Sequence, residues 1–261
     1  MSTVESLRIG TIPFANVMPL DFFLPEIMPE AELICEVPSK SAKMLAKAQV
    51  DVALVSIIEL FNHPEYSYIP GIGICSDGPV ESVCLFSQKE PQDIQSIALD
   101  NNSLASNTLL RILLREYWQI SPKLVTYTPP VCRGLEKADA ALCIGDNAFY
   151  ARFPKDESRY RYDLGALWKE LTGLPFVYAA WITRPELNPN LIADPFVEAK
   201  EKGLKHVNQL SLVCAQQRNL PADFIYRYFT QNIYYDLGEK ERQGIHCYFD
   251  KAKEILNSAI A

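Results

Sequence analysis

Histidine is scarce in this sequence, and several widespread site motifs are missing from it. The 261 residues contain only three histidines, and none of them has the spacing of an H-E-x-x-H metal site. The sequence also lacks the G-x-S-x-G turn of serine hydrolases, the G-x-x-x-x-G-K-[ST] phosphate loop and a complete G-x-G-x-x-G fingerprint. We therefore expect neither a metal site nor a Ser-His-Asp triad nor a nucleotide cofactor.

Long apolar runs and an excess of basic residues are also missing. No run approaches the roughly 18 to 20 apolar residues of a membrane span, and the amino terminus has no signal-peptide pattern. The 25 Lys and Arg are outnumbered by 32 Asp and Glu and form no basic stripe, so we expect no nucleic-acid partner. The seven cysteines never form C-x-x-C and mostly lie in apolar runs, which indicates buried free thiols. We expect a cytoplasmic protein with no membrane partner.

Apolar runs that alternate with amphipathic segments predict an α/β fold. Such continuous apolar strands are typical of a parallel sheet with helices on both faces. The length allows one large or two small domains. Strands are expected at residues 7–12, 33–37, 50–55, 97–99, 123–126, 140–144 and 176–182. Helices are expected at residues 39–48, 107–118 and 238–256, with a short helix from Leu164 to a stop at Gly173.

The chain shows no internal repeat and no low-complexity linker, so strands must join any two lobes. Ser82–Ser87 is the candidate outward crossing and Tyr178–Thr183 the return. This arrangement predicts a two-lobed fold of the periplasmic-binding-protein type (type II) with a double crossover. We expect lobe 1 to take residues 1–86 and 178–261, including a helical C-terminal tail, and lobe 2 to take 87–177. The substrate cleft would lie between the lobes.

Small polar residues stand at the ends of the expected elements. The set is Asn16, Ser56, Ser76, Ser82, Ser103, Ser106 and Asn147. Each residue alone is an ordinary helix cap or turn former, whereas hydroxyls and N–H groups of several helix starts around one cleft form an anion site. Such a site suits a small carboxylate.

Two details of this set concern its local structure and its chemistry. Ser56 and Glu59 have the spacing of a capping box, which predicts a helix that begins directly after the third strand. Asp77 and Asp146 are the candidate general acids or bases, and for Asp77 we favour an Asx turn instead.

A series of sequence blocks resembles the chorismate dehydratase family, the first enzymes of the futalosine route to menaquinone. The blocks are Asn16 with Pro19-Leu20, Val52–Glu59, Ser76–Val80 with Ser82, Ile144-Gly-Asp146, Asp163–Glu170, Thr172–Phe176 and Tyr235–Gly238. Their order and spacing extend almost end to end. The resemblance implies the two-lobed fold and a hydro-lyase that converts chorismate to 3-[(1-carboxyvinyl)oxy]benzoate and water without a cofactor.

The resemblance also implies roles for individual residues. Asn16 corresponds to the family's active-site asparagine and Ser82 to a substrate contact, while Ser103 and Ser106 would hold a carboxylate. The family usually has S-R-T-S at this helix start, whereas this chain has Leu104 and Ala105 between the two serines.

The expected mechanism is a stepwise elimination in which neutral donors stabilise the charge that develops on the substrate. Asn16 would orient the leaving hydroxyl or the enolpyruvyl group, with Ser56 and Asn147 as further substrate contacts. The base is either the side-chain carboxylate of chorismate or Asp146. The alternative function is a non-catalytic cytoplasmic protein of the same fold that binds a small carboxylate. The oligomeric state stays open.

Overall fold

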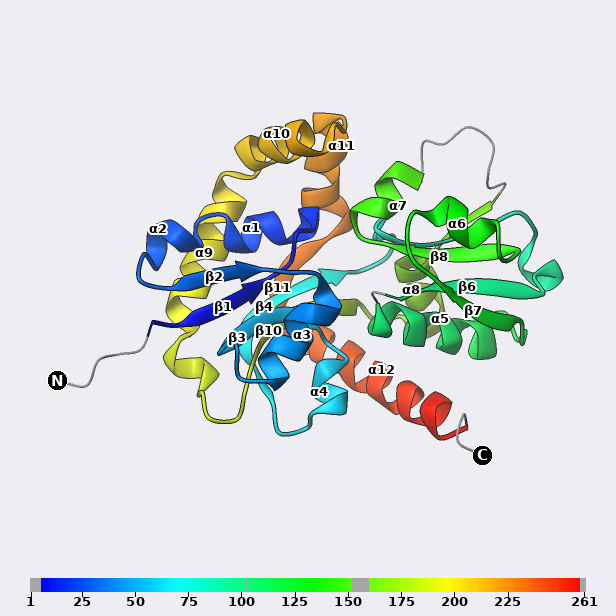
Figure 1. The fold of residues 1–261 in the computed structure, drawn as a ribbon, viewed down its shortest axis with the longest axis horizontal. Helices are drawn as coiled ribbons and strands as arrows, with labels where there is room; N and C mark the ends of the chain where they lie inside the picture. The colour runs from blue at the N-terminus through cyan, green and yellow to red at the C-terminus, as the bar shows by residue number, and fades with distance from the viewer. Residues whose placement is uncertain (1–5, 102, 152–159, 259–261) are drawn as a thin grey trace. The chain divides into compact units, whose positions relative to one another are not determined.

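The computed structural model describes residues 6–101, 103–151 and 160–258. The chain forms two compact units, each with a sheet of its own (Figure 1). Unit 1 consists of Met1–Cys75 and Val177–Gly238, and unit 2 of Ser76–Phe176 and Glu239–Ala261.

The sheet of unit 1 is mixed, with strand order β11-β4-β10-β3-β1-β2. Its strands are β1 (Arg8–Thr11), β2 (Glu32–Cys35), β3 (Val52–Ser56), β4 (Ser67–Ser76), β10 (Phe176–Thr183) and β11 (Tyr234–Leu237). The first three strands are parallel, as their apolar sequences predict, but β10 runs antiparallel to β3, and β11 antiparallel to β4. The sequence therefore predicts four of these strands, β1, β2, β3 and β10, but it predicts neither β4 and β11 nor the antiparallel directions.

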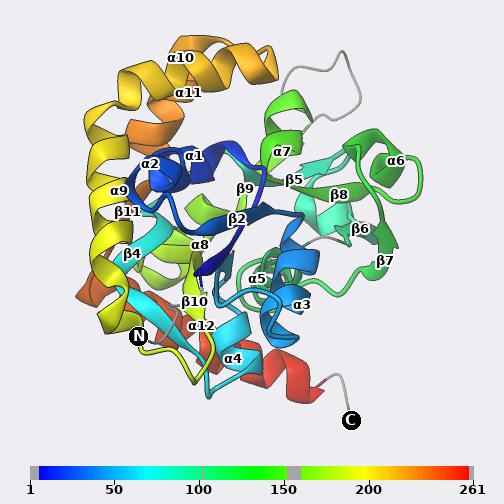
Figure 2. The same cartoon turned by 60° about the vertical axis from the view of Figure 1, so that its left-hand side comes forward.

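The helices of unit 1 cover both faces of the sheet. They are η1 (Ala15–Val17), α1 (Met18–Asp21), α2 (Leu24–Ile27), α3 (Pro38–Ala46), α4 (Glu59–Asn62), η3 (Pro189–Leu191), α9 (Ala193–Lys205), α10 (Val207–Arg218), α11 (Ala222–Arg227) and the π-helix η4 (Tyr228–Asn232). Helix α3 packs on β1 and β3, whereas α9 contributes Phe196, whose ring lies 5.0 Å from that of Trp181 on β10. Helices α1 and α2 lie alongside α9 (Figure 2).

A close approach of two helices fixes the segment that follows β1. A Cβ atom at Gly203 of α9 would lie 2.0 Å from the carbonyl oxygen of Pro19 in α1. Only glycine allows the two backbones to come this near. Helix α1 is therefore held directly against α9.

The sheet of unit 2 has strand order β7-β6-β8-β5-β9. Its strands are β5 (Val83–Ser87), β6 (Ser96–Asp100), β7 (Lys123–Tyr127), β8 (Ala140–Ile144) and β9 (Tyr160–Asp163). Strand β6 is parallel to β7 and β8, and β5 is antiparallel to β8 and β9. The bounds of β8 are the predicted ones, because all five of its residues are apolar and buried.

The helices of unit 2 are η2 (Pro91–Asp93), α5 (Leu104–Glu116), α6 (Val131–Leu135), α7 (Asp146–Ala151), α8 (Leu164–Thr172) and α12 (Glu239–Ser258). Helices α6 and α7 pack on β8, and α5 packs on α8 and α12; Figure 1 shows α5 and α6 on opposite sides of the sheet. Helix α8 begins at its N-cap Asp163 and ends before Gly173, which has a φ of 71°. Its predicted start and stop are confirmed.

The predicted division into lobes differs from the two units at two places. Strand β5, the predicted outward crossing, pairs with β8 and β9 and thus belongs wholly to the sheet of unit 2. The C-terminal helix α12, predicted as part of lobe 1, belongs to unit 2, where its Tyr248 is buried. Its hydroxyl donates a hydrogen bond to the carbonyl oxygen of Ala105 over 3.0 Å, and its ring contacts those of Trp168 and Phe176. The predicted cleft between lobes stays a prediction.

Candidate active site

Two predicted site residues lie at one edge of the sheet of unit 1. Strands β1 and β3 are parallel, so their last residues, Thr11 and Ser56, lie at the same edge, which we call the carboxyl edge of unit 1. Asn16 follows β1 in the short helix η1. Ligand sites of α/β proteins occupy this position, because loops and helix starts gather at the carboxyl ends of strands.

Asn16 and Ser56 each have a buried side-chain oxygen that could form a further hydrogen bond. Oδ1 of Asn16 and Oγ of Ser56 are buried, and neither atom has a hydrogen-bond partner among the residues that the structure describes. Roughly nine in ten buried polar groups are paired, because an unpaired one costs about 1 to 3 kcal/mol. Both atoms are thus available to a ligand, as the predicted roles require.

Asp21 at the end of α1 is a further ionisable group of this edge that the sequence analysis did not single out. Thr11 at the end of β1 donates its hydroxyl to Oδ2 of Asp21 over 2.6 Å. Burial raises the pKa of Asp21 to about 6, although this hydrogen bond and the charge of Arg218 act in the opposite direction. The signal in the sequence is a single acid within the apolar stretch Met18–Leu24.

Tyr235 of β11 is another buried polar group that interacts with Asp21. Its hydroxyl has no hydrogen-bond partner within the described part of the chain. Burial raises the pKa of Tyr235, and the neighbouring Tyr228, Cys214 and Asp21 raise it further. Tyr235 is therefore neutral and can only exchange neutral hydrogen bonds.

Three predicted residues come together at the corresponding edge of unit 2. Strand β5 is antiparallel to β8, so Ser82, just before β5, lies where β8 ends. The N–H of Gly145 donates to the carbonyl oxygen of Ser82 over 2.8 Å. Asp146 and Asn147 follow as the first residues of α7, both half-buried, while Ser82 is buried. We call this the carboxyl edge of unit 2.

Ser103 and Ser106 lie at the same edge, because β6 is parallel to β8 and leads into α5. Ser103 is the N-cap of α5, and its Oγ accepts the N–H of Ser106 over 3.2 Å. Ser106 is buried in the first turn. Between them, Leu104 is 52% exposed, whereas Ala105 is buried beneath α12.

Two local predictions about this region turn out differently. The capping box of Ser56 and Glu59 does not form, because Ser56 is the last residue of β3 and the N-cap of α4 is Ile58, without a side-chain hydrogen bond. Asp77 is exposed and pairs with Lys169 of α8. Asp77 thus has an electrostatic role on the surface.

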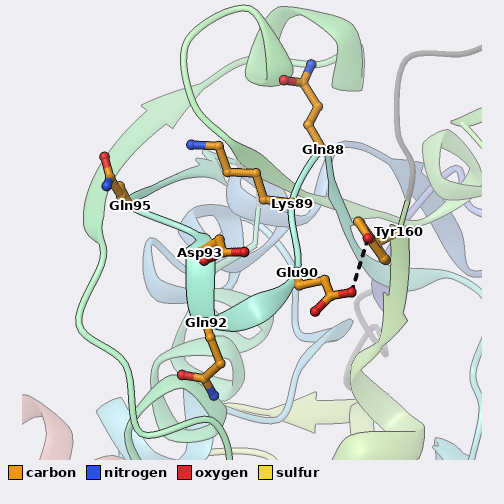
Figure 3. A pocket seen from close by; sticks show the side chains of 7 residues that line it. All are labelled: Gln88, Lys89, Glu90, Gln92, Asp93, Gln95 and Tyr160. Atoms are coloured by element: carbon orange, nitrogen blue, oxygen red, sulfur yellow. Dashed lines mark hydrogen bonds between the residues drawn. The ribbon is translucent and has the colours of Figure 1, made fainter.

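A polar pocket of about 760 Å³ lies at the opposite edge of the sheet of unit 2 (Figure 3). It is lined by Gln88, Lys89, Glu90, Gln92, Asp93, Gln95 and Tyr160. These residues lie near the end of β5 and the starts of β6 and β9, far along the strands from Ser82. Glu90 accepts a hydrogen bond from Tyr160 over 3.3 Å. No predicted site residue lines this pocket.

Several further expectations concern metals, thiols and membranes. Over residues 6–101, 103–151 and 160–258, no three His, Cys, Asp or Glu side chains cluster as metal ligands. In the same residues, no helix combines the length and apolarity that a membrane span requires. Of the cysteines, Cys75, Cys84, Cys143 and Cys214 are buried, as predicted, but Cys35 is exposed.

Comparison with solved structures identifies the fold. A protein of Archaeoglobus fulgidus, AF1704, superposes with a TM-score of 0.74 at 17% identity, over 96% of this chain and 98% of that protein. The periplasmic aliphatic sulphonate binding protein SsuA of Escherichia coli gives a TM-score of 0.64 at 18% identity, over 99% and 89% of the two chains. The predicted periplasmic-binding-protein-like fold is confirmed.

Comparison of sequences identifies the family. A chorismate dehydratase of Thermus thermophilus is 27% identical, over 92% of this chain and 93% of the relative. A chorismate dehydratase of Campylobacter jejuni is 29% identical, over 96% of this chain and 99% of the relative. The model of a family described as menaquinone biosynthesis matches residues 7–254, nearly the whole sequence, and the chain therefore belongs to this menaquinone-biosynthesis family.

Proposed function

We propose that this chain is a hydro-lyase of menaquinone biosynthesis that removes water from chorismate to give 3-[(1-carboxyvinyl)oxy]benzoate. The observation that carries the proposal is the similarity, over more than nine tenths of the chain, to two proteins named chorismate dehydratase. The unpaired buried oxygens of Asn16 and Ser56 support it independently, since a polar ligand would satisfy both.

The proposed reaction requires few chemically reactive groups from the protein. Chorismate carries two carboxylates, and its ring becomes aromatic when it loses one proton and the neighbouring hydroxyl. The protein has to fix the dianion, stabilise the charge that spreads into the ring carboxylate and exclude water. We propose a stepwise elimination without a cofactor, in which neutral hydrogen-bonding groups perform these tasks.

Asn16 has the best-defined role in this proposal. Its unpaired Oδ1 only accepts hydrogen bonds, and the enolpyruvyl group of the dianion has no hydrogen to donate. The hydroxyl of the ring does have one. Of the two predicted roles of Asn16, orientation of the leaving hydroxyl is therefore the one that the unpaired atom favours.

The serines supply donors for the carboxylates of the substrate. Ser103 uses its Oγ as an acceptor for the N–H of Ser106, which leaves its own hydrogen to donate. The N-terminus of the thirteen-residue helix α5 adds its partial positive charge at the same place. Ser56 and Ser82 are donors from other strand ends. Leu104 presents an apolar side chain where the family usually has arginine, so we expect a higher KM for chorismate.

Two groups remain as the base of the first step. One is the side-chain carboxylate of chorismate itself, and the other is Asp146, which begins α7 beside Ser82 and is half-buried. An Asp146→Asn variant separates them, because turnover persists only if the base belongs to the substrate.

The deciding experiment is incubation of the purified, chelator-treated chain with chorismate, followed by mass spectrometry for the product that lacks one water. We expect Asn16→Ala to lower kcat about 100-fold. Asn190→Ala is the matched control, since Asn190 lies in η3, another three-residue helix of unit 1, but is exposed. Saturable binding of chorismate by the folded wild-type chain without any product would refute the enzyme and favour a small-carboxylate-binding protein of the same fold.

A further inference from the structure

The segment between β4 and β5 contains a turn that few residues adopt. The N–H of Ser82 donates to the carbonyl oxygen of Val80 over 2.8 Å, which closes a three-residue turn centred on Glu81. Glu81 has a φ of 66°, in the left-handed region that favours glycine. A γ-turn with positive φ is rare and strained. Other interactions must therefore hold it.

One carboxylate accepts hydrogen bonds from two successive backbone N–H groups of this turn. Oδ1 of Asp163 accepts the N–H of Val80 over 3.0 Å, and Oδ2 accepts the N–H of Glu81 over 2.7 Å. Asp163 is the last residue of β9, the strand next to β5. The turn is thus bound by an acceptor from the neighbouring strand.

Arg161 of the same strand binds the rest of Glu81. Its guanidinium donates to the carbonyl oxygen of Glu81 over 3.1 Å and forms an ion pair of 2.6 Å with its carboxylate. The N–H, the carbonyl and the side chain of Glu81 are therefore all held by β9. Charge-assisted bonds of this kind are the stronger ones in proteins.

The bonds from Asp163 to the turn exceed what its helix requires. As the N-cap of α8, Asp163 accepts the N–H groups of Gly165 and Ala166 over 3.0 and 3.1 Å. These two bonds complete an ordinary cap. The two bonds to Val80 and Glu81 cross more than eighty positions of sequence, and they serve the turn alone.

This turn sets the position of Ser82. The serine follows the strained residue directly, it is buried, and its carbonyl oxygen accepts the N–H of Gly145 next to Asp146. We propose that Asp163, assisted by Arg161, is a positioning residue for the reaction, which holds the turn that sets where Ser82 meets the substrate. This inference rests on the function proposed above.

The test variant is Asp163→Asn. It keeps the shape of the side chain but replaces one of the two oxygens that accept the backbone N–H groups by an NH2 group, which can only donate. Its matched control is Asp139→Asn. Asp139 also accepts two backbone N–H groups, from Gln95 and Ser96 over 2.9 and 3.1 Å, but at the opposite edge of the same sheet. The loss of a carboxylate that accepts two backbone N–H groups is therefore common to both variants.

The readouts are kcat/KM for chorismate and the hydrogen exchange of the amides of Val80 and Glu81. We expect Asp163→Asn to lower kcat/KM about 10- to 100-fold and Asp139→Asn to leave it within about twofold. Exchange of the two amides should become at least about tenfold faster in Asp163→Asn only. In combination with Ser82→Ala, Asp163→Asn should add less than about a further twofold loss, because both changes remove the same contact.

Two results would overturn the inference. In the first, Asp163→Asn has the kcat/KM of the wild type although Ser82→Ala lowers it. In the second, the fold-losses in kcat/KM of the two single variants multiply in the double variant. If the wild-type chain does not convert chorismate, the proposed function fails and the positioning role fails with it. The exchange rates then still decide separately whether Asp163 holds the turn.

Discussion

Replacement of Asp21 by asparagine removes a buried charge from unit 1 and leaves an acceptor for the Thr11 hydroxyl. The two side chains have the same shape, so the substitution isolates the cost of ionisation. Because burial is the main cause of the raised pKa, the charged form is the one that the fold disfavours. The stability of the wild type should therefore fall, relative to Asp21→Asn, as Asp21 ionises.

The size of this stability change, and the pH range over which it occurs, follow from the pKa values of Asp21 in the unfolded and the folded chain. The pKa of Asp21 rises from 3.8 in the unfolded chain to about 6 in the folded one. A difference of about two pKa units, at 1.36 kcal/mol each, corresponds to about 3 kcal/mol. Between these values the folded chain binds more protons than the unfolded one. The contribution of protonated Asp21 is thus complete below about pH 4 and is lost as the pH rises through 6.

The assay is urea unfolding of both chains at several pH values between 4 and 8. The difference in unfolding free energy should move in favour of Asp21→Asn by up to about 3 kcal/mol over this range and then level off above about pH 7. Asp223→Asn controls for loss of charge in the same unit, because Asp223 is exposed on α11. A difference between wild type and Asp21→Asn that does not vary with pH would refute the reasoning.

Two further substitutions test the carboxyl edge of unit 1 and its support. Ser56→Ala removes a buried hydroxyl without a partner in the described residues, so the urea-unfolding free energy should rise by about 1 kcal/mol while kcat/KM for chorismate falls. Lost stability with full turnover would contradict this. Gly203→Ala places a methyl group 2.0 Å from the backbone oxygen of Pro19, so thermal unfolding should show an unfolding free energy lower by about 1 to 3 kcal/mol. The control Glu201→Ala, on the exposed side of α9, should leave the unfolding free energy unchanged.

Local structure is the level at which the sequence predicts this fold best. Ala140–Ile144 forms a strand with the predicted bounds because every residue is apolar, and Gly173 ends α8 because it adopts a positive φ. The helix at residues 107–118 in fact begins at Leu104, because Ser103 provides the cap. Periodicity and caps are properties of neighbouring residues, so a single sequence contains them.

The assignment of elements to units depends on information that neighbouring residues lack. The apolar pattern of Val83–Ser87 predicts a buried strand, but nothing in it states which sheet the strand joins. The amphipathic pattern of Glu239–Ser258 likewise predicts a covered face and not the surface that covers it. The partners of both segments are distant in the sequence, and only the structure reveals them.

In the candidate site, too, some features can be predicted from the sequence and others only from the structure. The place of Asn16 after a strand and the family resemblance both predict its role, whereas Ser56 is predicted from its place at a strand end alone. The structure adds their unpaired oxygens. Asp21 was missed because its significance comes from burial. Asp163 lies in a family block, but its bonds to residues 82 and 83 positions earlier are absent from any local pattern.

The order of the chain has a consequence for how the protein is made. Unit 1 needs Tyr234–Leu237 to complete its sheet, and unit 2 needs α12 to cover α5 and α8. Most multidomain chains complete their first domain while the ribosome still makes the next. Here neither unit is complete until the segment that contains β11 and α12 has been synthesised. A chain that stops before Glu239 would therefore have the complete sheet of unit 1, but in unit 2 the helices α5 and α8 would lack their contacts with Tyr248.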